Sequence, residues 1–167
     1  MYTTAQQLTS QTLKTQITRW CMAGFISLTF FSYGTAMMDY FLVYPSRLLI
    51  GEREFVPYHA LLEERILPIS VIPFGILTLF NIALLFLKLP STLKKLVLAS
   101  FVCLLLDWLS TIFIQIPINL QLNTGKDEYL IKYIMDTNWI RIVLESAQAG
   151  IALLVLGYSI HKREAYR

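Results

Sequence analysis

Four side chains that can carry charge or hydrogen bonds recur along a helix predicted for residues 138–160. Asn138, Arg141, Glu145 and Gln148 are separated by three, four and three residues, and this spacing places them on a single helical face. The sequence that follows is apolar enough to continue as a membrane span. Ionisable groups inside a membrane face a bundle interior or a wet cavity, and they are functional candidates by default.

A second polar stripe is predicted for the segment 96–120. Asp107, Thr111, Gln115 and Asn119 occur at every fourth residue, which again selects one helical face. The two segments meet at the outer end of the predicted bundle. We therefore expect Gln115 and Asn119 to lie level with the first stripe, and Asp107 to lie deeper, towards the middle of the bilayer.

Asp39 adds a polar group from a third segment, residues 20–44. It lies within about two helical turns of the same outer surface, so polar groups from three helices converge there. Two interpretations stay open. The groups form interhelical hydrogen bonds and ion pairs, with Arg141 paired to Glu145 or Asp39, or they line a pocket that opens outward beneath residues 45–65.

His59 and Glu63 are four residues apart in the segment FVPYHALLEER, so both can face one point. His59 is a candidate for proton transfer because histidine titrates near neutral pH. It can also be an ordinary interfacial side chain, or half of a metal site with Glu145 as third ligand. The pattern is common, and no haem-ligating histidine falls inside a predicted span. We therefore expect neither a metal nor a cofactor.

The composition indicates a membrane protein. Of the 167 residues, 56% are hydrophobic and only 15% are charged, whereas a soluble domain has about a quarter charged. Mean hydropathy is +0.57. The net charge of +3 is small and dispersed, so nucleic acid is not an expected partner. The expected partner is the lipid bilayer.

Four apolar stretches are each long enough to cross a bilayer, which takes about 20 helical residues. They predict a single all-α domain over residues 1–167, an integral membrane up-down four-helix bundle whose first outer loop holds a short interfacial helix. Pro68 and Pro73 fall in the first turns of the second stretch, and Pro117 is expected to bend or end the third. The predicted spans are about 20–44, 66–87, 96–120 and 138–160.

The distribution of Lys and Arg predicts that both termini are cytoplasmic. The two tails and the short second connection carry eight basic residues, against five in the two outer connections, where seven acidic residues accompany them. The eight are Lys14, Arg19, Lys88, Lys94, Lys95, Lys162, Arg163 and Arg167.

The segments IPINLQL (116–122) and YLIKYIMDTNWIRIVLESAQAGIALLVL (129–156) resemble the DUF1772 family, which includes anthrone oxygenase-like membrane proteins. That family typically has a VPxN element at the end of its third helix and a W/N-x-x-R element opening its fourth. The first span, ending in FLVYPSRL, is also similar to the family's first span. The matching positions are Pro117, Asn119, Asn138, Trp139 and Arg141.

The resemblance implies a four-helix membrane protein and, as in the family's characterised branch, oxygenation of an aromatic anthrone at a benzylic carbon without a cofactor. Such chemistry needs a base to form a carbanion or enolate and donors to hold the oxyanion. His59 or Glu145 is the candidate base. The candidate oxyanion donors are Arg141, Asn119 and Asn138, and Trp139, Asp39 and Gln115 complete the expected set that binds a lipophilic substrate.

A non-catalytic role is the main alternative. An accessory subunit or assembly scaffold would use its intramembrane polar groups for structure. Small residues on one helix face would then contact a membrane partner or a second copy of the chain. A transporter ranks lower, because four spans without a repeat are few for a carrier. The candidate small residues are Gly24, Ser27, Gly34, Ala147 and Gly150.

Overall fold

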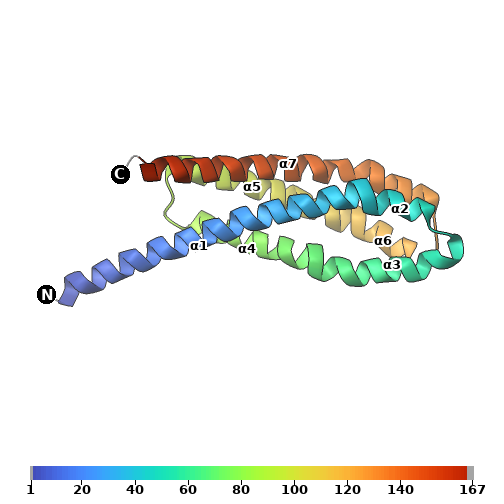
Figure 1. The fold of residues 1–167 in the computed structure, drawn as a ribbon, viewed down its shortest axis with the longest axis horizontal. Coiled ribbons are helices and arrows are strands. Elements are labelled where there is room, and N and C mark those ends of the chain that lie inside the picture. Colours follow the sequence, from blue (N-terminus) through green and yellow to red (C-terminus); the bar gives the residue numbers. More distant parts are fainter. Residues whose placement is uncertain (1, 165–167) are drawn as a thin grey trace.

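Four long helical rods make up the fold in the computed structural model, which describes the backbone of residues 2–164 and the side chains of residues 12–161 (Figure 1). No strand occurs within this part of the chain. The first three rods each join two α-helices through a five-residue π-helical turn, and the fourth is a single α-helix. In order they are α1 (Tyr2–Met38), η1 (Asp39–Val43) and α2 (Tyr44–Leu49); α3 (Glu52–Ile66), η2 (Leu67–Val71) and α4 (Ile72–Phe86); α5 (Ser91–Ser110), η3 (Thr111–Gln115) and α6 (Ile116–Leu122); and α7 (Glu128–Glu164).

Each π-helical turn ends two residues before a proline, namely Pro45, Pro73 or Pro117. A proline inside an α-helix lacks the N–H donor, and its ring collides with the carbonyl four residues earlier. A hydrogen bond to the fifth preceding carbonyl widens the helix and relieves this conflict. The residue after each turn donates such a bond, for example the Ile116 N–H to the Thr111 carbonyl. Pro117 therefore does not end its helix, which continues to Leu122.

The rods are packed up and down, so that neighbours in sequence are neighbours in space (Figure 1). α1 packs against α4 and α7, and α5 packs against the same two helices. One apolar core lies between these four helices, and a second lies at the end formed by α2, α3 and α6 with the start of α7. The first core includes Phe25, Leu77, Leu84, Leu104, Ala152 and Val155, and the second includes Tyr44, Phe55, Ile118, Leu122, Ile131 and Ile134.

The prediction of a four-span membrane protein is confirmed. Each rod contains a stretch that is long and apolar enough to cross a bilayer, and apolar side chains cover much of the outer surface of all four. The protein is therefore an integral multi-pass membrane protein. α1 begins and α7 ends at the same end of the bundle (Figure 1); the side of the membrane on which this end lies stays a prediction.

The segment 45–65 is arranged differently from the expected outer loop. The first helix continues past Pro45 to Leu49, and the chain turns at Ile50 and Gly51. The helix expected around His59 is present as α3, but it runs without a break into the second span. The combined rod of 35 residues is about 50 Å long, against about 30 Å for the hydrocarbon core. The charged end of α3 therefore extends beyond the hydrocarbon.

Candidate functional site

A layer of buried polar side chains adjoins the two apolar cores. Its members come from all four rods, and all of them except Arg141 are at most 9% exposed. Such groups are costly to bury in an apolar medium unless they find partners. The layer comprises Asp39, Arg47, His59, Asp107, Gln115, Asn138, Glu145 and Gln148, with the Arg141 side chain, 12% exposed, among them.

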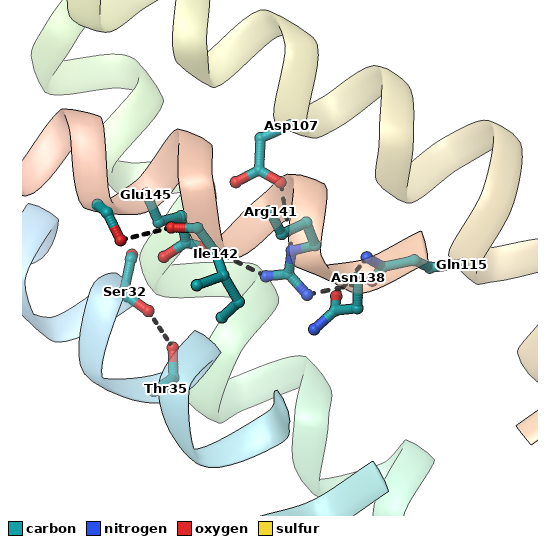
Figure 2. Close-up of polar contacts among 9 residues, drawn as sticks. Ser32, Thr35, Asp107, Gln115, Asn138, Arg141, Ile142 and Glu145 are labelled. Carbon is teal, nitrogen blue, oxygen red and sulfur yellow. Dashed lines mark hydrogen bonds and ion pairs between the residues drawn. The ribbon is translucent and has the colours of Figure 1, made fainter. Parts of the chain in front are cut away.

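Arg141 is the centre of the layer (Figure 2). Its Nε donates to Asp107 Oδ1 at 3.2 Å, its Nη1 to Gln115 Oε1 at 3.1 Å, and its Nη2 to Glu145 Oε1 at 3.1 Å. The guanidinium thus joins α5 and η3 to its own helix, α7. Gln115 Nε2 in turn donates to Asn138 Oδ1 at 2.8 Å, which adds a second connection between the third and fourth rods.

The predicted face of the fourth span is confirmed. Asn138, Glu145 and Gln148 are at most 2% exposed, and Arg141 lies with them. Two ion-pair partners were predicted for Arg141. Glu145 is hydrogen-bonded to it, whereas Asp39 is not among its hydrogen-bond partners. Asp39 is buried beside both Arg141 and Arg47, and its Oδ2 has no hydrogen-bond partner.

A second polar cluster lies nearer the turn between the first two rods. Arg47 Nη1 donates to Asn119 Oδ1 at 2.9 Å, and the Arg47 guanidinium lies 5.0 Å from the centre of the Tyr44 ring. His59 Nε2 donates to the Asn119 backbone carbonyl at 3.0 Å, and it lies 3.8 Å from Glu63 Oε1. Asn119 therefore ties α6 to both α2 and α3.

A pocket of about 340 Å³ lies between the second and third rods, and Arg47 and Arg141 reach it from the other two. All three π-helical turns either line it or precede a helix that does. Its polar lining includes Arg47, Glu63, Thr111, Gln115, Asn119 and Arg141, and its apolar lining includes Leu67, Val71, Phe74, Trp108, Ile116 and Leu120.

The mouth of the pocket lies on the side of the bundle rather than beneath a roof. Leu67, Ile116 and Leu120 line it and are 54%, 46% and 60% exposed, so they belong to the apolar surface that faces lipid. The segment that was expected to cover an outward opening instead supplies one wall, through α3. The pocket therefore opens towards the apolar surface of the bundle.

The sequence-predicted residues divide into three groups. Arg141, Asn119 and Gln115 line the pocket. His59, Glu145, Asn138 and Asp39 are buried in the polar layer but do not line it. Trp139 is 54% exposed and belongs to neither cluster.

Three residues of the site were missed as site residues. Asp107 binds Arg141 directly. The sequence signal for this role is its position at the start of the polar stripe that continues to Asn119. Arg47 is one of the five basic residues in the predicted outer connections, and the sequence does not show that the first helix continues past Pro45 and buries it. Glu63 was considered only with His59, whereas it lines the pocket itself.

Among the described residues, no three His, Cys, Asp or Glu side chains are grouped so that they could hold a metal ion. Comparison of the chain with protein-family models, with curated proteins and with solved structures finds no significant match. The resemblance to the DUF1772 family therefore stays a prediction.

Proposed function

We propose that this membrane protein binds a lipophilic molecule with an anionic or acidic polar end in the pocket between the second and third rods. The pocket volume of about 340 Å³ falls in the range typical of small-molecule sites, about 300–1,000 Å³. An apolar lining with a few polar groups is also typical of such sites. The ligand's apolar part would contact the lining nearest the lipid.

Arg47 carries the proposal. It is a buried cation, 2% exposed, and its hydrogen-bond partner is a neutral amide. Within the described part of the chain, it has no carboxylate within ion-pair distance, and its Nε lacks a hydrogen-bond partner. Asp39 and Glu63 are near enough to interact with Arg47 electrostatically, but neither forms an ion pair with it. A buried charge is normally in contact with an opposite charge, and an anionic group in the pocket would supply that contact.

Trp108 provides a direct assay, because it lines the pocket. Trp20 and Trp139, the other two tryptophans, are replaced by Phe, and the protein is placed in lipid nanodiscs. A brominated long-chain carboxylic acid is the probe, and the brominated alcohol of equal length is its uncharged match. We expect saturable quenching of Trp108 by the acid at far lower concentrations than by the alcohol.

The Arg47→Gln variant tests the assignment of the anion site. A hydrogen bond to a charged group is worth about 1.5–3 kcal/mol, so we expect the affinity for the acid to fall by about 10- to 150-fold. Arg53→Gln is the matched control, since Arg53 lies on α3 and is exposed. Equal quenching by acid and alcohol, or an unchanged affinity in Arg47→Gln, would contradict the proposal.

Oxygenation of the bound molecule is a second candidate function, favoured by one observation. Glu63 lines the pocket and lies beside His59, so a carboxylate base faces the same space as Arg47 and Arg141. Base-assisted oxygenation converts an activated CH₂ group and O₂ into a ketone and water. Glu63 would remove the proton, and the two arginines would hold the enolate oxygen.

Oxygen uptake with an anthrone as substrate tests this second function. We expect Glu63→Gln to lose turnover while probe binding persists, and Glu64→Gln, on an exposed neighbour, to retain it. Turnover by Glu63→Gln at the wild-type rate would exclude Glu63 as the base. Binding of the acid without any oxygen uptake would exclude oxygenation and leave ligand binding as the only supported function. An accessory or scaffold role predicts neither binding nor turnover.

A further inference from the structure

Arg141 lies between two carboxyl groups that reach it from different rods. Asp107 on α5 is 0% exposed and Glu145 on α7 is 2% exposed, and each accepts one hydrogen bond from the guanidinium (Figure 2). Both carboxyl groups therefore contact the same guanidinium, at 3.2 Å for Asp107 Oδ1 and 3.1 Å for Glu145 Oε1. With both of them ionised, one cation would face two anions in the membrane-spanning part of the bundle.

The surrounding elements do not supply the missing positive charge. η1 contributes Asp39, which adds a further negative charge, and α2 contributes the neutral phenol of Tyr44. α5 itself contributes the thiol of Cys103. The other cation of the layer, Arg47 on α2, lies near Asp39 without forming an ion pair with it, and α4, η3 and α6 hold no ionisable side chain. Two cations therefore stand against three carboxyl groups.

The second oxygen of each carboxyl group is also unaccounted for. Asp107 Oδ2 and Glu145 Oε2 are buried and have no hydrogen-bond partner. Buried polar atoms are hydrogen-bonded in the great majority of proteins. An uncompensated ionised group in a low-dielectric interior costs several kcal/mol. A single proton would remove the excess negative charge. It would also turn one carboxyl group into a hydrogen-bond donor for the other, so that the second oxygens gain a partner.

We propose that Asp107 and Glu145 form a proton-binding site in which the two carboxyl groups share a single proton above Arg141. One of them is then a carboxylate that balances the guanidinium, and the other is a neutral acid. Neither carboxyl group lines the pocket, although Arg141 does. The charge balance argued here involves only residues of the protein and no bound ligand.

Infrared spectroscopy of the full-length protein in lipid measures such a proton directly, since the C=O stretch of a protonated carboxyl group is distinct from that of a carboxylate. We expect wild-type protein at neutral pH to show one protonated carboxyl group in its interior. Both single variants, Asp107→Asn and Glu145→Gln, should lose this signal completely, because the remaining carboxyl group would form a balanced pair with Arg141. Glu64→Gln, which changes an exposed carboxylate, should retain the signal.

The response of both variants is what distinguishes sharing from simple burial. If one residue held the proton because of its own surroundings, substitution of the other would leave the signal in place, and that result would overturn the proposal. Absence of the signal from wild-type protein would overturn it without any variant. In that case a dependence of stability on sodium or potassium would indicate a bound cation instead. Loss of the signal in both variants is required for the proposal, and retention of the signal in either one is sufficient to overturn it.

Discussion

Replacement of Arg141 is the most severe test of the polar layer. The Arg141→Gln variant keeps a hydrogen-bonding side chain but removes the charge. It also removes the three donors that reach Asp107, Gln115 and Glu145. Both carboxyl groups would remain buried without a cation beside them. We expect the bundle to be strongly destabilised, because the third and fourth rods would lose their main polar connection.

The size of the effect follows from the burial of these groups. Removal of one partner from a buried ion pair costs about 3–5 kcal/mol, since an uncompensated charge is left behind. Protonation of both carboxyl groups would limit this cost, so we expect about 3 kcal/mol. If Arg141→Met is combined with Asp107→Asn and Glu145→Gln, no charge is left. Neutral or apolar replacements of buried ion pairs are often tolerated, so the triple variant should lie within about 2 kcal/mol of wild type.

Reversible unfolding by SDS in mixed micelles, followed by circular dichroism, measures these free energies. Arg53→Gln is the control for loss of an exposed arginine, and it should change the free energy of unfolding by no more than about 0.5 kcal/mol. The reasoning would be refuted if Arg141→Gln cost less than about 1 kcal/mol. It would also fail if the triple variant were less stable than Arg141→Gln alone.

Two further predictions concern packing and orientation. A Cβ at Gly24 would lie 2.8 Å from the Phe80 ring, whereas a Cβ at Gly150 meets nothing within 4 Å. Gly24→Ala should therefore lower the free energy of unfolding by about 1–3 kcal/mol, while Gly150→Ala should be neutral or stabilise the helix by up to about 1 kcal/mol; equal effects in the same unfolding assay would contradict this packing. Both termini are expected in the cytoplasm, so a glycosylation acceptor inserted at Gly51 should be modified and one inserted at Leu89 should not. The reverse glycosylation pattern would show that both termini lie on the opposite side of the membrane.

The polar face of the fourth span shows how far periodicity alone can be used. The spacing of Asn138, Arg141, Glu145 and Gln148 sufficed to predict that they share a buried face, because an α-helix without a proline keeps its period over its whole length. The same reasoning gave the four spans, since about 20 apolar residues have few other stable arrangements. The resemblance to a known family added expectations that the fold alone does not test.

The partners within the polar layer were decided by tertiary structure. Each π-helical turn adds a residue to its turn and so shifts the register of everything beyond it. Asn119 thereby faces Arg47 and His59, while Asp107 and Gln115 share Arg141. The sequence shows the prolines but not whether each will end, kink or widen its helix, because that choice depends on what packs around it. The lateral pocket between the second and third rods follows from three such local choices made at one level of the bundle.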